Sequence, residues 1–194
     1  MSKGSATRLE QAAATKTALI AAATARFGAD GYQATTLDVA AADVGVTKGA
    51  VYHHFAGKKA LFTAVFMTVQ RGLVAAVARS SATGTALERL RNACRCYLDE
   101  CTAGTARIVL ADGPSVLGDT WYQIEDRLWL RALRDLIHHA QRDGQFAPVD
   151  TDLAARVISA AITQLATAAI DQSPSAPDVQ LVLLATLRGF ELPG

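Results

Sequence analysis

Apolar residues recur with a helical period along almost the whole chain. The first segment shows this pattern well, since one stripe holds Leu9, Ala13, Lys16, Ile20, Ala23 and Phe27. Apolar positions three and four residues apart favour amphipathic helices, whereas strands need strict alternation between turn residues. No convincing alternation of that kind is found. We therefore expect an all-α protein, and a hydrophobic content of 51% suffices for a sizeable core.

Glycine and proline residues indicate where the helices end. Gly28 is expected to end the first helix, and Gly57 precedes a long amphipathic helix from Lys58 to about Arg79. Further helices are expected near residues 86–102, 105–111, 119–143, 152–170 and 177–191. The breaks between them are expected at Gly104 and at residues 112–114, 144–148 and 173–177.

Two short helices are expected between the first helix and the long one. Thr35 to Asp38 has the pattern of an N-cap with an acid at the third helical position, and Gly45 closes this helix. Its inner face would consist of Leu37, Ala40, Ala41 and Val44. Thr47 can cap a second helix of residues 47–53, with Val51 and Phe55 pointing to the same core. Two short helices joined by a tight turn form a helix-turn-helix unit.

The outer side of the second short helix combines small residues with hydroxyls and cations. Its residues are Lys48, Gly49, Ala50, Tyr52 and His53. A glycine inside a helix costs about 1 kcal/mol relative to alanine, so the small pair indicates that another body approaches the backbone closely. Hydrogen bonds could come from Thr47, Tyr52 and His53, and charge from Lys48. This composition predicts a recognition helix in the major groove of DNA.

Two further residues are expected to contact DNA phosphates. Lys58 would reach a flanking phosphate, and Thr36 lies at a helix N-terminus, where backbone N–H groups attract anions. The net charge of +1 conceals an asymmetry. Residues 1–60 hold seven basic and four acidic residues, a net of +3, and the remainder holds twelve and fourteen, a net of −2. A basic N-terminal part fits a chain that meets a polyanion there.

These motifs together resemble the N-terminal signature of the TetR family of bacterial transcriptional regulators. The matching residues are Phe27-Gly-x-x-Gly31-Tyr32, Thr35-Thr36, Val46 to Phe55 and Lys58-x-x-Leu61, within roughly residues 13–65. Residues 112–118 (DGPSVLG) also resemble a segment of one group of TetR C-terminal domains. One departure concerns Ala40 and Val44, because the family usually has a large aliphatic residue at the first position and a small one at the second. The two share a helix face, so the exchange affects local packing only.

The resemblance implies an all-α homodimer with two domains. Residues 1–57 would form the three-helix, helix-turn-helix DNA-binding domain, and residues 58–194 a larger helical domain that dimerises and binds a ligand. The expected function is that of a ligand-responsive repressor, which a small effector releases from its operator. Activation of transcription in place of repression stays open, and the sequence identifies neither the effector nor the operator.

A dimer is also expected from the residues themselves. No charged residue occurs from Val157 to Ile170 or from Val179 to Leu187, and helices apolar all round need cover on every side. A second copy related by a two-fold axis would supply it and would require a palindromic operator. The expected interface residues are Val157, Ala161, Leu165, Val182, Leu183 and Leu187. A membrane span is not expected, because no apolar run reaches about 20 residues.

Candidate effector-binding residues lie in the middle helices. They are mainly apolar and aromatic, which favours a hydrophobic or aromatic effector: Phe66, Cys94, Trp121, Ile124, Trp129 and Gln164. Aromatic residues at helical spacing, including Tyr122, are usually core, so a pocket and an ordinary core are both open. Gln164 would face the ligand or form a hydrogen bond across the dimer interface.

Other functional classes lack support in the sequence. No phosphate loop, nucleophile elbow or metal-ligand spacing is found, so we expect no enzyme, no cofactor and no metal. The segment MSKGSATRLEQ has no apolar signal core, which favours the cytoplasm. Two alternatives stay open, namely a DNA-binding protein that senses no small molecule and acts constitutively or as an architectural factor, and a redox sensor using Cys94, Cys96 and Cys101. The default for these cysteines is buried, reduced thiols.

Overall fold

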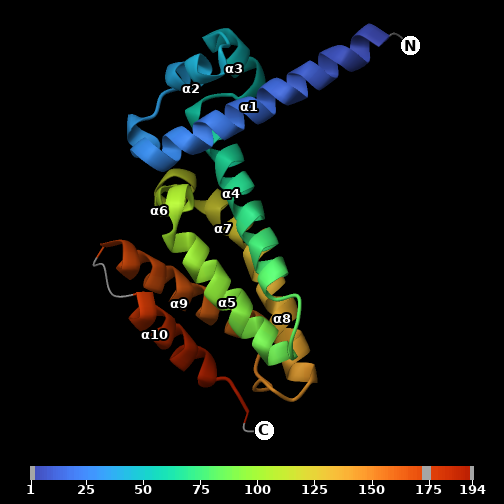
Figure 1. Cartoon of the computed structure of the whole chain (residues 1–194), viewed down its shortest axis with the longest axis vertical. Helices are drawn as coiled ribbons and strands as arrows, with labels where there is room; N and C mark the ends of the chain where they lie inside the picture. Colours follow the sequence, from blue (N-terminus) through green and yellow to red (C-terminus); the bar gives the residue numbers. More distant parts are fainter. Residues whose placement is uncertain (1–2, 172–175, 193–194) are drawn as a thin grey trace.

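The computed structural model describes residues 3–171 and 176–192, which form a bundle of helices with no strand beyond an isolated bridge between Phe146 and Glu191. The all-α prediction is confirmed. Figure 1 shows a small N-terminal unit above an elongated body, joined by one long helix. The N-terminal helices are α1 (Lys3–Ala34), α2 (Leu37–Val44) and α3 (Lys48–His54), and the connecting helix is α4 (Lys58–Ser80). The body adds α5 (Ala86–Thr102), α6 (Gly104–Leu117), α7 (Asp119–Glu125), a π-helical turn (Asp126–Leu130), α8 (Arg131–Arg142), α9 (Thr151–Asp171) and α10 (Ala176–Arg188).

The N-terminal unit is organised around an aromatic cluster. Phe27 packs edge-to-face on Phe62 at a centroid distance of 5.1 Å, and Tyr32 packs on Phe62 at 5.0 Å. Phe62 belongs to α4, so the connecting helix shares a core with α1. Leu9 is 70% exposed, and the first turns of α1 extend beyond the rest of the molecule (Figure 1). The buried part of the predicted stripe begins only near Leu19.

Two predicted boundaries in this unit are wrong. The first helix continues through Gly28, which is buried, and breaks at Gly31, whose φ of 76° is strained for residues with a side chain. The N-cap of α2 is Thr36 and not Thr35, so Asp38 is the second helical residue and not the third. The exchanged sizes at positions 40 and 44 are accommodated because Ala40 is fully buried whereas Val44 is only partly covered.

The body forms a second core in which α5, α8 and α9 pack together. The expected break at residues 112–114 is wrong, because α6 runs through this segment to Leu117. Gly113 serves close packing instead of a turn, since a Cβ there would lie 2.6 Å from Cε2 of Phe66. The expected helix 119–143 is continuous but contains the π-helical turn. The expected break at 173–177 lies mostly outside the described residues.

Two helices, α4 and α9, are long and apolar enough to span a membrane by length and composition, so the expectation that no segment reaches that length is wrong. Such a match is weak evidence, because a core helix has the same composition. Both helices carry core residues here, including Leu61 and Val65 of α4 and Ile158 and Ile162 of α9.

Candidate DNA-binding surface and effector cavity

The α2–α3 unit has the geometry of a helix-turn-helix motif. The Thr36 hydroxyl accepts a hydrogen bond from the Val39 N–H at 3.3 Å, and the Thr47 hydroxyl accepts one from the Ala50 N–H at 3.2 Å. These caps satisfy N–H groups that a helix start leaves unpaired. Between the helices, Gly45 adopts a φ of 71°, which glycine tolerates without strain.

The outer face of α3 is open, as its sequence predicts. Val51 is fully buried on the inner side, whereas Tyr52 is 52% exposed and His53 is also exposed. Gly49 is exposed, and a Cβ added there would meet only the Thr47 hydroxyl, at 3.8 Å. The small residue is therefore not required by packing inside the free chain. Its absent side chain leaves the backbone of α3 accessible from outside.

Two lysines lie beside this face. Lys48 forms an exposed ion pair with Asp38 at 2.9 Å, and the hydrogen bond to this carboxylate raises the pKa of Lys48. The Lys58 ammonium donates to the Gln33 carbonyl at 3.1 Å and lies 4.3 Å from the centre of the Tyr32 ring. Lys58 is thereby held near the loop that leads to Thr36.

His53 and His54 lie side by side at the end of α3. His54 is half-buried next to His53, with the ring centres 5.4 Å apart. No group of three or more potential metal ligands occurs among the described residues.

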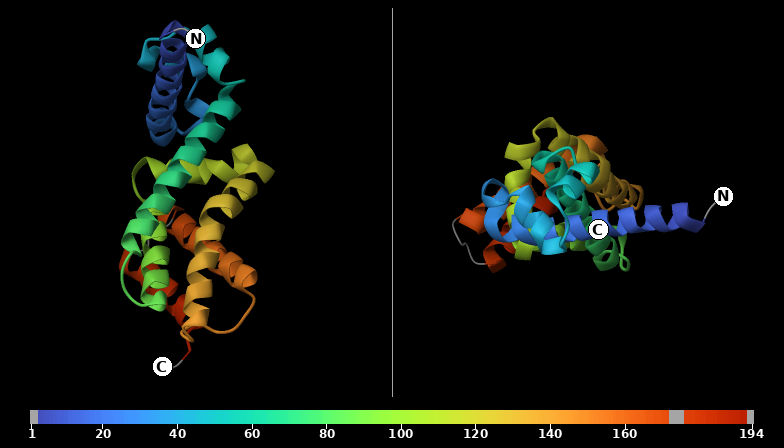
Figure 2. Two further views of the ribbon diagram at one scale, coloured as in Figure 1. Left: turned by 90° about the vertical axis from the view of Figure 1, so that its right-hand side faces the viewer. Right: turned by 90° about the horizontal axis from the view of Figure 1, so that it is seen from above.

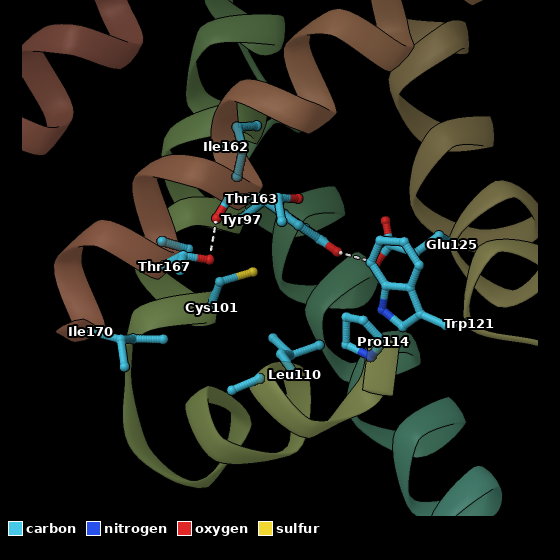
Figure 3. Close-up of a pocket in the computed structure, with 12 residues that line it drawn as sticks. Tyr97, Cys101, Leu110, Pro114, Trp121, Glu125, Ile162, Thr163, Thr167 and Ile170 are labelled. Atoms are coloured by element: carbon cyan, nitrogen blue, oxygen red, sulfur yellow. Dashed lines mark hydrogen bonds between the residues drawn. The ribbon is translucent and has the colours of Figure 1, made fainter. Parts of the chain in front are cut away.

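A cavity lies in the body between α5, α6, α7 and α9 (Figure 3). Its volume is about 180 Å³, and a neighbouring hollow of about 380 Å³ shares Pro114, Trp121, Glu125 and Thr163 with it. The two spaces therefore adjoin at these residues. Their combined extent falls in the range of small-molecule sites.

The predicted pocket residues divide into two groups. Trp121 lines both spaces, and Gln164 lines the neighbouring hollow. Phe66, Cys94 and Trp129 do not line the cavity, because each is fully buried in a core. Ile124 faces a different hollow, between α4 and α7. These four residues lie outside this cavity because residues on an apolar helix can point either to the core or to a void at the same spacing.

A buried polar cluster at the cavity wall was not predicted. Gln70 of α4 donates to Oε1 of Glu125 at 2.6 Å, and the Tyr97 hydroxyl of α5 lies 3.2 Å from both that oxygen and Oε1 of Gln70. Figure 3 shows Tyr97 extending toward Glu125. Burial raises the pKa of Glu125 to about 7, and burial together with this carboxylate raises the pKa of Tyr97. Charge can therefore appear or disappear on Glu125 near neutral pH.

The sequence places both Gln70 and Glu125 at helix positions where apolar residues are expected. Gln70 lies four residues after Phe66 and three before Leu73, in a position where the helix otherwise buries apolar residues. Glu125 lies four residues after Trp121, on the same face of its helix. A polar residue within an apolar stripe indicates a buried hydrogen-bond network or a ligand site.

Cys94 and Cys101 are buried, which disfavours redox chemistry at these two positions. Burial raises the pKa of the Cys94 thiol to about 12, and it also raises the pKa of Cys101. The reactive form is the thiolate, and a raised pKa suppresses it. The described structure contains all three cysteines as free thiols.

Helix α6 connects the cavity wall directly to the N-terminal unit. Leu110, Ala111 and Pro114 line the cavity. Between them, Asp112 accepts a hydrogen bond from the Tyr32 N–H at 2.7 Å, just after the break in α1. Figure 1 shows α6 directly beneath α1.

The outer faces of α9 and α10 expose apolar residues. Val157 and Val182, both predicted interface residues, are 45% and 53% exposed. Leu153, one helical turn before Val157, and Leu181, next to Val182, are exposed as well. Ala161 and Leu165 are half-buried. Leu183 and Leu187 are 0% and 1% exposed in the chain's own core, so these two are not available to a partner.

Similarity to known proteins agrees with this architecture. A family profile described as "Bacterial regulatory proteins, tetR family" matches residues 19–65, and one described as "Tetracyclin repressor-like, C-terminal domain" matches residues 87–188. The second profile alone covers more than half of the chain. No curated protein sequence matches this chain.

Solved structures share the fold over nearly the whole length. A TetR-family transcriptional regulator from Pectobacterium atrosepticum is 26% identical, with a TM-score of 0.81 over 95% of this chain and 97% of that one. SmeT, the repressor of the Stenotrophomonas maltophilia multidrug efflux pump SmeDEF, is 24% identical, with a TM-score of 0.74 over 92% and 91% of the two chains. RolR in complex with resorcinol is 18% identical, with a TM-score of 0.75 over 94% and 90%. With both family profiles matched, the chain belongs to the TetR family of bacterial transcriptional regulators.

Proposed function

We propose that this TetR-family chain is a ligand-responsive repressor that binds a palindromic operator as a homodimer. The observation that carries the proposal is the exposed outer face of α3, where Gly49 leaves the helix backbone accessible. Members of the family are generally DNA-binding repressors, and generally not enzymes. We extend both statements to this chain, and we place it in the cytoplasm, where its operator would be.

The DNA contacts follow from the position of each side chain. Gly49 and Ala50 allow α3 to enter the major groove, where Tyr52 and His53 are free to form hydrogen bonds. Lys48 would exchange its exposed carboxylate partner for a phosphate, which costs little because surface ion pairs are weak. The N-termini of α2 and α3, with Thr36 and Thr47, add backbone N–H groups for phosphates.

The dimer would form through the exposed apolar faces of α9 and α10. Leu153 and Val157 on one helix and Leu181 and Val182 on the other leave a hydrophobic surface that a second copy can bury. A two-fold axis through such a four-helix contact presents two copies of α3 to the same side of DNA, with half-sites about 34 Å apart or a multiple of it.

Helix α6 supplies a route from effector to DNA-binding unit. An effector in the cavity would contact Pro114 and Leu110, and a displacement of α6 would act on α1 through Asp112 and Tyr32. This α6–α1 contact would act beside α4, which shares a core with α1 and also links the two parts of the chain. The effector acts only through different affinities for the two arrangements.

The proposal is tested by titrating labelled DNA from the region flanking this protein's own gene and following fluorescence anisotropy. Tyr52→Ala and Lys48→Ala should each weaken binding. Arg79→Ala removes an exposed charge at the far end of α4 and should not. Equal binding by all four proteins would overturn the assignment of α3. Strong binding that no small molecule reverses would favour a regulator that senses nothing.

A further inference from the structure

Hydrogen bonds from described residues reach only one of the two carboxylate oxygens of Glu125. Its side chain is 7% exposed, and the hydrogen bonds from Gln70 and Tyr97 both fall on Oε1. No hydrogen bond to Oε2 is found among the described residues. Oε2 is nevertheless not fully buried, because Gln180 Oε1 is the one described side-chain polar atom that is both fully buried and without a partner. Oε2 is therefore reachable from the cavity that Glu125 lines.

Two further polar groups of the cavity, the hydroxyls of Thr163 and Thr167, also present acceptors. The Thr163 hydroxyl donates its proton to the Ser159 carbonyl at 3.0 Å. The Thr167 hydroxyl donates its proton to the Thr163 carbonyl at 2.9 Å (Figure 3). Each hydroxyl has one proton, so both offer only lone pairs to a ligand. An ammonium group carries three donors and no acceptor, and it matches this wall.

The remaining wall is apolar and includes an aromatic ring. Leu110 and Pro114 of α6 and Ile162 of α9 line the space, and the indole of Trp121 lies beside Glu125 (Figure 3). Indole is the aromatic group that attracts a cation most strongly. A flat hydrocarbon with one charged end would therefore satisfy both halves of the cavity.

None of the side chains that the structure describes brings a compensating positive charge to this carboxylate. Among the side chains that the structure describes, the charged or titratable groups facing this site are Tyr97 and Cys101 of α5 and Arg156 of α9. Arg156 lines only the neighbouring hollow and is paired with Asp152 at 2.7 Å and Asp126 at 3.5 Å. The first two stay neutral because burial raises the pKa of each. An ionised Glu125 therefore lacks a counter-charge until a ligand brings one.

We propose that the cavity binds a compact aromatic monocation, whose ammonium group pairs with Oε2 of Glu125 while its ring packs against Trp121 and the aliphatic wall. Calling this ligand the effector rests on the proposed function, whereas its binding does not. The cation supplies the missing charge, and the threonine oxygens accept its remaining N–H groups. A neutral ligand of the same shape leaves the carboxylate unpaired or protonated.

The test compares 1-naphthylmethylamine with 1-naphthalenemethanol, its neutral counterpart, by isothermal titration calorimetry on the full chain. The wild type should bind the amine at least about tenfold more tightly. Glu125→Gln should abolish this preference, and Glu100→Gln, which removes an exposed carboxylate from α5, should retain it. Melting curves of each variant confirm that it is folded.

A second measurement keeps the test independent of the variant. Because the pKa of Glu125 is about 7, the amine should bind the wild type about tenfold more weakly one pH unit below that value than one unit above it, and the alcohol should not. Equal affinities for amine and alcohol, a preference that survives Glu125→Gln, or no amine binding at millimolar concentration would each overturn the proposal. Anisotropy with operator DNA and no ligand tests the repressor function separately.

Discussion

The Tyr32 N–H donates to the Asp112 carboxylate over 2.7 Å, and this contact joins the end of the DNA-binding unit to the helix that lines the cavity. It lies directly after Gly31, where α1 breaks with a φ of 76°. The carboxylate therefore satisfies a backbone donor that the broken helix leaves without an internal partner. Cavity and DNA-binding unit are thus separated by a single helix.

Removing this carboxylate should loosen the junction. Asp112→Ala is expected to lower the free energy of unfolding by about 1–2 kcal/mol, because a hydrogen bond to a charged acceptor is lost at a half-buried site. It should also speed hydrogen exchange at the Tyr32 amide. Ser115→Ala is the control, since its hydroxyl donates only to the Asp112 carbonyl at 3.0 Å. Unchanged exchange at Tyr32 would show that the contact does not hold the junction.

Gly113 should be intolerant of a side chain. A Cβ there would lie 2.6 Å from Cε2 of Phe66 and 3.0 Å from Cδ1 of Trp121, so Gly113→Ala should destabilise the chain by about 1–3 kcal/mol through overpacking. Gly72→Ala in α4 is the matched control. Its Cβ would meet nothing within 4 Å, and the helix should gain up to about 1 kcal/mol. Urea unfolding of the two variants measures both changes, and similar values would contradict the packing of α6.

Gly49 should separate stability from DNA binding. Gly49→Ala meets only the Thr47 hydroxyl, at 3.8 Å, so the free chain should be as stable as the wild type or slightly more so. The added methyl group faces the groove, and operator affinity should fall by about 1–3 kcal/mol. Thermal melting and anisotropy on the same preparation give the two values. Full operator affinity in this variant would mean that the backbone of α3 does not approach DNA closely.

Glu125 should make stability depend on pH. Its ordinary pKa of 4.5 rises to about 7 in the folded chain, so between these values the folded state binds a proton that the unfolded state has released. Stability from this group therefore falls as pH rises from 4.5 to 7, by about 3 kcal/mol in total, and then stays level. Glu125→Gln does not titrate, so its stability relative to the wild type should increase across this window. Urea unfolding measures the free energy of unfolding of both proteins at pH 5 and pH 7. The same difference between them at both pH values would contradict the burial of this carboxylate.

Sequence reasoning was most successful where one pattern permits one structure. The Thr47 cap, Gly45 and the inward positions Val51 and Phe55 leave few alternatives for the α2–α3 unit, and its helices were predicted within about a residue. Glycine was misread at residue 113, because the same residue type serves turns and close packing. Only the neighbouring Phe66 ring, distant in sequence, distinguishes the two.

The cavity was less predictable for a related reason. Helical periodicity shows which residues point inward, but not whether they meet another side chain or an empty space. Trp121 and Trp129 both lie in the helix expected at residues 119–143, yet Trp129 stacks on Tyr97 at 3.9 Å while Trp121 borders the cavity. The Gln70–Glu125 pair joins residues of two helices, and no local pattern connects them.

The most direct test of the account is a DNase I footprint on the DNA flanking this protein's own gene, combined with the mass of the protein–DNA complex. We expect two protected half-sites related by a two-fold axis, their centres about 34 Å or a multiple of it apart, with an even number of chains per site. The Val182→Glu variant, with a charge on the exposed face of α10, should lose this protection. No protection at low salt, or a single half-site occupied by one chain, would contradict the central claim that two copies of α3 bind DNA together.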